Sequence, residues 1–108
     1  MKQHMQALQR ANNVRLYRAG IKRKLRSYPT RTESRRAAAE LMLIEDPALD
    51  GMRVHDLLAS CTRTGKITAN KIMSRAAIPE AKLIGYLTPR QRELLAAMLG
   101  ARREAMAA

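Results

Sequence analysis

The sequence predicts an all-α fold, a small helical bundle with a long basic helix at its N-terminus. Two observations support this prediction. Apart from three Tyr and one Cys, the apolar residues of the 108-residue chain are Leu, Ile, Val, Met and Ala, without Phe or Trp, a set that favours helices over strands. Apolar residues also recur at helical spacings of three and four, and the sequence has no strand-like alternation of useful length. The length suits one domain with a modest core.

The first predicted element is a helix over residues 2–27. Its apolar stripe, with members three or four positions apart, consists of Val14, Tyr17, Ile21, Leu25 and Tyr28. The basic stripe beside it consists of Arg15, Arg18, Lys22 and Arg26. Pro29 ends the helix, because the residue before a proline avoids the α region. The first dozen residues have little periodicity, so we expect residues 1–12 to be a frayed end.

A second helix is expected from Thr30 to about Asp46. Thr30 and Glu33 have the spacing of a capping box, in which two side chains satisfy backbone amides at a helix start. The predicted buried face and the two residues that widen it are Ala37, Leu41 and Ile44 with Ala38 and Met42. Residues 45–51 are expected to form a turn or a short irregular helix.

Three shorter helices complete the predicted bundle, over about 53–60, over about 66–77, and from Thr88 to Gly100. The connection 79–87 is expected to hold one helical turn. Thr88 and Gln91 form a second capping-box pattern, and Pro89 suits the first helical position. The predicted core face of the last helix is Leu94, Leu95, Met98 and Leu99. We therefore expect one domain over residues 13–100, followed by a tail over 101–108.

The charge of the chain indicates a polyanionic partner. Lys and Arg number 21 against 9 Asp and Glu, which gives a net charge of +12. The charge is segregated, with +10 in residues 1–36, −4 in residues 37–62 and +6 in residues 63–108. An excess of this size opposes compactness through self-repulsion, so a partner that neutralises it is expected. Nucleic acid is the first candidate, and an anionic membrane surface is the second.

Residue content disfavours other classes of function. The helix over 2–27 has no Trp or Phe to anchor it in a membrane interface, and no run of about 20 apolar residues could span a bilayer. Cys61 lies on an apolar stripe, which predicts a buried thiol in a reducing cytoplasm. His4 and His55 lie far apart, and no Cys/His spacing suggests zinc. We expect no enzymatic activity, no metal site and no cofactor.

The stretch 63–69, Arg-Thr-Gly-Lys-Ile-Thr-Ala, has the residue types of a phosphate clamp at a helix start. Gly65 would let a phosphate approach the backbone, Lys66 would add charge, and Thr64 and Thr68 would add hydroxyl donors. A plain helix–helix turn with a glycine at its bend is the alternative. The other bases of the expected phosphate-binding surface are Arg63, Lys71, Arg75, Lys82, Arg90 and Arg92, together with Arg15, Arg18, Lys22 and Arg26.

Residues 51–78, "GMRVHDLLASCTRTGKITANKIMSRAAI", and residues 87–99, "LTPRQRELLAAML", resemble the actinobacterial integration host factor family. Residues that match the family pattern are Met52, Arg53, Val54, Leu57, Leu58, Gly65, Lys66, Ala69, Ile72, Met73, Gln91 and Arg92. The basic stretch "ANNVRLYRAGIKRKL" resembles the family's first helix more loosely. Arg63 departs from the pattern, because a glycine or small residue is often found there. The usually Arg-rich connection after Pro79 keeps only Lys82.

This resemblance implies a nucleoid-associated protein with a helix–two-turn–helix module, a module shared with a small-subunit ribosomal protein. It implies DNA bending or bridging and support of nucleoid structure or site-specific recombination. From the sequence we therefore expect a cytoplasmic, predominantly monomeric protein that binds double-stranded DNA through phosphates, with little sequence preference. One alternative is an RNA- or ribosome-associated module. The other is an adaptor that binds a protein such as a recombinase through the acidic segment 37–62.

Overall fold

The computed structural model describes the backbone of residues 2–100 and the side chains from residue 5 onward; the expected tail lies outside this range. The described chain forms α1 (Lys2–Ser27), α2 (Arg31–Leu43), the 3-10 helix η1 (Pro47–Leu49), α3 (Val54–Ala59), α4 (Gly65–Arg75), the 3-10 helix η2 (Ile84–Tyr86) and α5 (Pro89–Met98). Within residues 2–100 there is no strand, and the single isolated β-bridge joins Arg53 to Leu83. The all-α prediction is confirmed.

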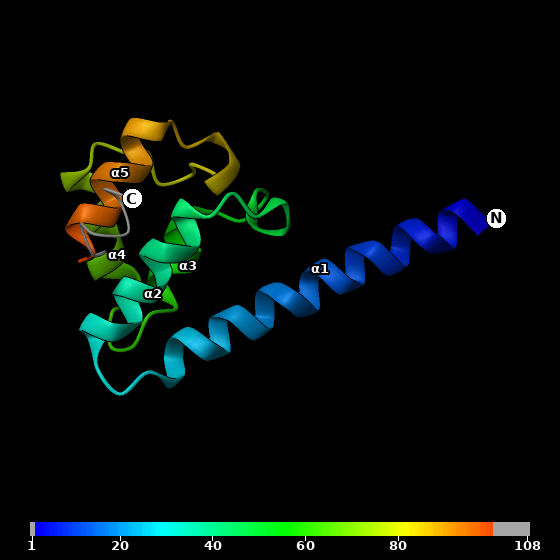
Figure 1. Cartoon of the computed structure of the whole chain (residues 1–108), viewed down its shortest axis with the longest axis horizontal. Helices are drawn as coiled ribbons and strands as arrows, with labels where there is room; N and C mark the ends of the chain where they lie inside the picture. Colours follow the sequence, from blue (N-terminus) through cyan, green and yellow to red (C-terminus); the bar gives the residue numbers. More distant parts are fainter. Residues whose placement is uncertain (1, 101–108) are drawn as a thin grey trace.

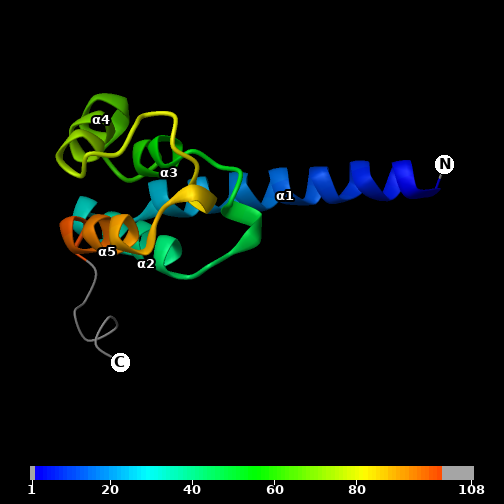
Figure 2. The same ribbon diagram turned by 90° about the horizontal axis from the view of Figure 1, so that it is seen from above.

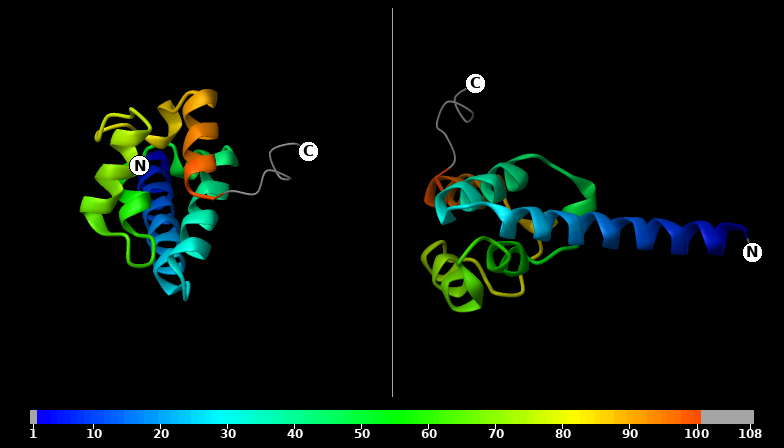
Figure 3. Two further views of the ribbon diagram at one scale, coloured as in Figure 1. Left: turned by 90° about the vertical axis from the view of Figure 1, so that its left-hand side faces the viewer. Right: turned by 90° about the horizontal axis from the view of Figure 1, so that it is seen from below.

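Helix α1 defines the long axis of a molecule whose extents are 47 × 28 × 28 Å. Its N-terminal half extends away from the other helices (Figure 1). Its C-terminal half lies beside two helix pairs, α2 with α5 on one side and α3 with α4 on the other (Figures 2 and 3). The N-terminal half of α1 therefore presents most of its surface to solvent. No helix within the described range is long and apolar enough to cross a membrane.

The core lies where the two helix pairs meet α1. Leu25 of α1, Met42 of α2, Leu57 and Leu58 of α3, and Leu95 of α5 are all buried there. Burial of such side chains stabilises the fold by about 1.5–3 kcal/mol each. Within residues 2–100 no Tyr is fully buried in the core, although Tyr28 packs against it from a half-buried position.

The buried face of α2 differs from the predicted one. The residues buried on it are Ser34, Ala38, Ala39 and Met42, whereas Ile44 is 62% exposed. The helix packs against α1, α3 and α5 together, so its most buried line is turned toward the centre of the three. Ala37 and Leu41 lie on the edge that faces α1 and are only half-buried. The helix also ends at Leu43, earlier than predicted.

The buried face of α5 also differs from the predicted one. Leu95, Ala96 and Leu99 are buried, whereas the predicted core residues Leu94 and Met98 are 44% and 37% exposed. The start of the helix matches the prediction, because the Thr88 amide donates to Gln91 Oε1 (3.0 Å) and the Gln91 amide donates to Thr88 Oγ1 (3.1 Å).

The segment before α3 and the segment after α4 run side by side and close the bundle. The amide of Val54 donates to the carbonyl of Lys82 (3.0 Å), and the amide of Gly85 donates to the carbonyl of Asp50 (3.0 Å). A Cβ at Gly85 would lie 2.8 Å from the Cβ of Asp50, so only glycine fits. These contacts hold the α3–α4 pair against the connection to α5.

Candidate nucleic-acid interface

The turn between α3 and α4, residues 60–64, has an uncommon backbone conformation. Arg63, in this turn, has a φ of 53°, and Gly65, the first residue of α4, has a φ of 67°; both lie in the left-handed region. Residues other than glycine occupy this region at a cost of about 1–2 kcal/mol. A Cβ built on Gly65 would meet no atom within 4 Å, so the space beside its backbone is open.

The first turn of α4 offers backbone amides to an anion. The leading N–H groups of a helix have no carbonyl partner within the helix and carry a partial positive charge. Thr64 is the N-cap residue, and its side chain forms no capping hydrogen bond. A phosphate that approaches past Gly65 can therefore accept hydrogen bonds from these amides, as anions do at other helix starts.

The polar side chains of α4 lie on two flanks. Thr68, Lys71 and Arg75 follow one another at spacings of three and four and so share one flank. Lys66 precedes Thr68 by two positions, about 200° around the helix, and lies on the other flank beside the turn. Lys66, Lys71 and Arg75 are exposed, and Thr68 is half-buried. Lys66 therefore lies beside the helix start, whereas Lys71 and Arg75 lie farther along α4, with Arg75 in its last turn.

A buried junction of hydrogen bonds fixes the turn to the corner between α1 and α2. Ser34 is fully buried; its hydroxyl donates to the carbonyl of Leu25 (2.6 Å) and accepts from the amide of Thr62 (2.9 Å). The hydroxyl of Thr62 lies 2.9 Å from the same carbonyl and 2.8 Å from that of Tyr28. The Thr62 hydroxyl thus supplies a hydrogen-bond donor at the C-terminal end of α1, where the last carbonyls of a helix have no partner within the helix. The turn cannot move without breaking these bonds.

Thr64 and Arg35 have roles that the sequence pattern does not predict. The side chain of Thr64 is buried; its hydroxyl donates to the carbonyl of Thr62 (3.2 Å) and accepts from Nε of Arg35 (3.3 Å). This hydroxyl is used within the protein, so Thr64 stabilises the turn rather than supplying a donor for a ligand. The contact also brings the guanidinium of Arg35 from α2 to the turn, where it can meet a phosphate.

His55 joins α3 to the start of α4. Its Nε2 lies 3.3 Å from the carbonyl oxygen of Lys66, and its ring is buried. The bond fixes the backbone from which the Lys66 side chain extends.

Cys61, in the turn itself, is also buried, as predicted, and burial raises the pKa of its thiol.

The four bases of the predicted stripe on α1 differ in their surroundings. Arg15 and Arg26 are exposed and Lys22 is half-buried, whereas Nε of Arg18 donates to the carbonyl of Ala48 in η1 (2.7 Å). Arg18 therefore holds α1 to η1. Arg26 lies at the end of the stripe nearest the turn, because its carbonyl oxygen is 3.4 Å from the Thr62 hydroxyl.

The three remaining predicted bases lie on the segments that follow α4. Arg92 is engaged internally, since its guanidinium donates to the carbonyls of Met42 (2.6 Å) and Ile84 (2.8 Å) and ties α5 to α2 and η2. Arg90 is exposed and Lys82 is half-buried. Their segment lies at the end of the bundle away from the turn (Figure 1), so the structure does not bring them to the clamp.

The cations around the turn are not neutralised within the described part of the chain. The ion pair found there joins Asp56 to Arg53 (3.5 Å), and the Asp56 carboxylate also lies 3.9 Å from Nδ1 of His55. Neither of them involves Arg63 or Lys66. The turn thus combines open helix-start amides with unpaired positive charge, the chemistry that favours a phosphate.

Residues 41–99 match the family of the S13-like H2TH domain. This stretch is more than half of the chain, and the chain belongs to that family of helix–two-turn–helix proteins. The matched range contains α3, the turn at residues 60–64 and α4. No curated protein matches the chain.

The structure of sIHF bound to an 8-bp palindromic DNA is similar to this one. The two chains are 28% identical and superpose with a TM-score of 0.66, and the match covers 85% of this chain and 99% of the sIHF chain. The resemblance to integration host factor that the sequence predicts is confirmed.

Proposed function

We propose that this protein binds double-stranded DNA as an architectural protein, with the turn at residues 60–64 and the start of α4 as its phosphate clamp. The observation that supports the proposal most directly is the open helix start at Gly65, held rigidly by the Ser34–Thr62 junction and flanked by unpaired cations. The similarity to sIHF, whose structure contains DNA, points to the same ligand.

The proposed contacts are mainly to the phosphate backbone, which implies little sequence preference. From the predicted surface we retain Arg63, Gly65, Lys66, Thr68, Lys71, Arg75, Arg15, Lys22 and Arg26, and we add Arg35. Arg18, Thr64 and Arg92 are left out because their polar groups are used inside the protein. Lys82 and Arg90, at the far end of the bundle, would meet DNA only if the duplex bends around the protein or if a second duplex is bridged.

Salt dependence of binding tests the proposal. If about six to eight phosphates are neutralised, log K plotted against log salt concentration has a slope of roughly −5 to −7 for duplex DNA. A slope near −2 would contradict the proposed surface, because most of the positive charge would then lie outside the interface. Substituting Arg15, Lys22 and Arg26 together with Ala is expected to flatten the slope. The helix content measured by circular dichroism is expected to stay unchanged.

Structured RNA is the second candidate ligand, supported by the match to an S13-like domain. A parallel titration with duplex RNA and single-stranded DNA separates the candidates. The proposal requires duplex DNA to bind most tightly at every salt concentration. Tighter binding to duplex RNA would favour the RNA-associated function instead.

We further propose DNA bending or bridging as the activity, and support of nucleoid structure or of site-specific recombination as the cellular role. Fluorescence transfer between dyes at the two ends of a short duplex measures bending. Co-sedimentation of two duplexes of different length measures bridging.

Recovery of a recombinase from nuclease-treated extract would instead support the adaptor function of the acidic segment.

A further inference from the structure

Ile67, in the first turn of α4, is an exposed apolar residue within the proposed phosphate-binding surface. Its side chain is 74% exposed. At about 100° per residue it points about 160° away from the buried Ala69, and it lies between Lys66 on one flank of the helix and Lys71 on the other. Helix α4 itself lies at the edge of the molecule opposite α5 (Figures 2 and 3). The rest of the described chain therefore leaves this side chain uncovered.

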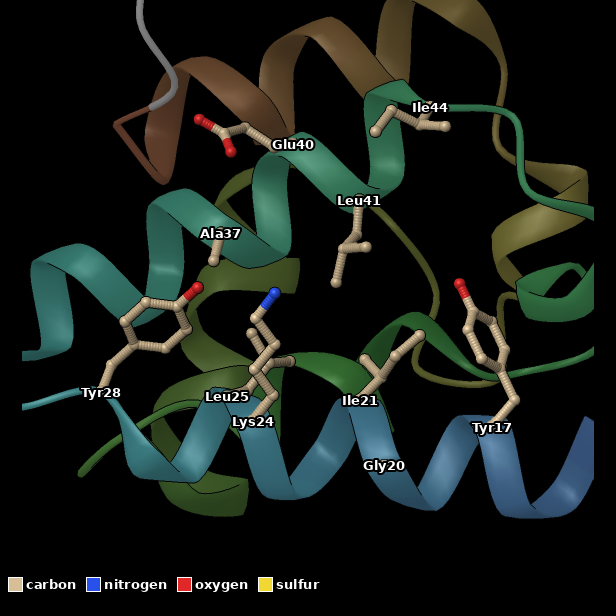
Figure 4. Close-up of a pocket in the computed structure, with 10 residues that line it drawn as sticks. All are labelled: Tyr17, Gly20, Ile21, Lys24, Leu25, Tyr28, Ala37, Glu40, Leu41 and Ile44. Atoms are coloured by element: carbon tan, nitrogen blue, oxygen red, sulfur yellow. The ribbon is translucent and has the colours of Figure 1, made fainter.

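Ile67 has no apolar neighbour on its own face of α4. The exposed residues that share this face are Asn70, Lys71 and Ser74. Exposed apolar residues at the end of α2 and on α5 do have such neighbours. Ile44, which is 62% exposed, lies beside Leu41 in a groove between α1 and α2 (Figure 4), and Leu94 and Met98 lie one turn apart on α5. The surface around Ile67 therefore fits a ligand that is anionic but has apolar parts, as DNA has in its sugars and bases.

The Ile67 side chain leans toward the proposed phosphate site. In an α-helix the Cα–Cβ bond tilts toward the N-terminus, so a side chain covers the surface over the turn before it. For Ile67 this is the start of α4, where the space beside Gly65 is open. In a DNA strand the atoms next to a phosphate belong to deoxyribose, which lines the minor groove, and then to a base. An apolar side chain beside a clamped phosphate therefore contacts sugar and base.

Both the side chain and the backbone of Ile67 are held stiffly. Isoleucine is β-branched and has one strongly preferred side-chain rotamer in a helix. The carbonyl oxygen of the preceding Lys66 lies 3.3 Å from Nε2 of the buried His55, and the hydrogen bond from Thr62 to Ser34 fixes the turn before the helix. A side chain that separates stacked bases must resist their restacking. The stiffness of this helix start therefore suits a wedge.

From these observations we infer that Ile67 is a wedge that bends DNA. Its side chain enters the minor groove beside the clamped phosphate and partly unstacks one base step. Apolar residues, isoleucine among them, act in this way in proteins that kink DNA from the minor groove. The inference rests on the proposed DNA binding and assigns a residue to the proposed bending. It also predicts a preference for pyrimidine–purine steps, because these steps unstack most easily.

Fluorescence transfer between dyes at the two ends of a short duplex, measured at saturating protein, tests the inference. The parent protein is expected to raise the transfer, because bending shortens the distance between the two ends. Ile67→Ala is expected to lose most of this rise, whereas Ile67→Leu keeps the apolar volume and is expected to retain it. The matched control, Ile44→Ala, makes the same truncation at an exposed isoleucine in the groove between α1 and α2 and is expected to bend DNA like the parent.

Aminopurine, an adenine analogue whose fluorescence is quenched by stacking, reports the unstacking itself. It replaces adenine at each position of the duplex in turn, so the emission shows which base steps open. The parent protein is expected to raise the emission, and to raise it more at a TA step than within a run of adenines. Ile67→Ala is expected to leave the emission at the level of the free duplex, and Ile44→Ala is expected to behave like the parent.

Binding titrations separate a failure of this inference from a failure of the proposed function. Ile67→Ala is expected to keep the parent's slope of log K against log salt concentration, because the wedge contacts no phosphate. Circular dichroism verifies that each variant is as helical as the parent. If the parent does not bind duplex DNA, the proposed function fails and the inference fails with it. The inference alone is overturned if the parent binds without bending the duplex, or if Ile67→Ala bends and unstacks it as the parent does.

Discussion

The amide of Thr62 donates a 2.9 Å hydrogen bond to the hydroxyl of Ser34, which lies 28 positions earlier in the chain. The same hydroxyl donates to the carbonyl of Leu25, so one buried atom links α1, α2 and the turn. A buried hydroxyl that both donates and accepts makes the junction sensitive to the loss of either partner.

Ser34→Ala is expected to lower the free energy of unfolding by about 2 kcal/mol, because it leaves the Thr62 amide without its acceptor and removes a donor from the Leu25 carbonyl. Urea denaturation measures the change. Ser74→Ala, at an exposed position of α4, is the control and is expected to change stability by less than about 0.5 kcal/mol. Equal effects of the two substitutions would show that the junction is not specially stabilising.

Arg63→Gly is expected to raise stability and weaken DNA binding together. Glycine relieves the left-handed strain of about 1–2 kcal/mol at φ 53° but costs about 0.5–1 kcal/mol in chain entropy, so the net gain is up to about 1 kcal/mol, while the cation beside the turn is lost. Ala77 has a φ of 55°, so Ala77→Gly relieves similar strain without a change of charge. This second variant is expected to melt at a higher temperature than the parent and to bind DNA unchanged. A loss of affinity in both variants would point to backbone flexibility rather than charge.

Lys66→Glu is expected to weaken binding to every duplex sequence alike, by about 2 kcal/mol, the usual strength of a charge-assisted contact. Stability should hardly change, because an acid in the first turn of a helix suits the helix dipole. Lys24→Glu makes the same charge change in the groove between α1 and α2 and serves as the control in a binding titration at low salt. If the two variants bind equally well, the turn is a plain connection between helices.

Gly65→Ala and Gly20→Ala are expected to change stability in opposite directions. At Gly65 the new methyl group meets no atom, but a φ of 67° strains alanine by about 1–2 kcal/mol. At Gly20, within α1 and also with open space, alanine favours the helix by up to about 1 kcal/mol. Thermal melting curves measure both changes. A stabilising Gly65→Ala would mean that the turn relaxes to another conformation in solution.

Cys61 is expected to react with a thiol reagent only after unfolding. Burial raises the pKa of the thiol, so less thiolate is present at neutral pH than in the unfolded chain, and the native fold also blocks access. Reaction with a chromogenic disulfide, followed with and without denaturant, measures the difference. Rapid reaction in the native protein would show that the turn opens readily.

Local patterns in the sequence predict most of the helices, because their signals lie within a few residues. Pro29 and Pro89 mark an end and a start, and Thr88 with Gln91 forms the expected capping box. The buried faces of α2 and α5 are less predictable, since each helix touches several others and the most buried line depends on all of them. Ile44, Leu94 and Met98 fit an apolar pattern yet are partly exposed for this reason.

The sequence locates the turn but not what holds it in place. Gly65 and Lys66 are found from their residue types beside a helix start. Ser34 and Arg35 reach the turn from 28 and 29 positions away, and no local pattern relates them to it. For the same reason, Arg18 and Arg92 cannot be separated from the exposed bases until their carbonyl partners are known.

The elongated shape of the molecule sets how much of a duplex it can occlude. At 3.4 Å per base pair, the 47 Å axis corresponds to about 14 bp, and the 28 Å axes correspond to about 8 bp. The duplex in the sIHF structure has the shorter of these lengths. The number of base pairs occluded per bound molecule at saturation therefore reports orientation: close packing every 8 bp places α1 across the double helix, and spacing of 14 bp places it along the double helix.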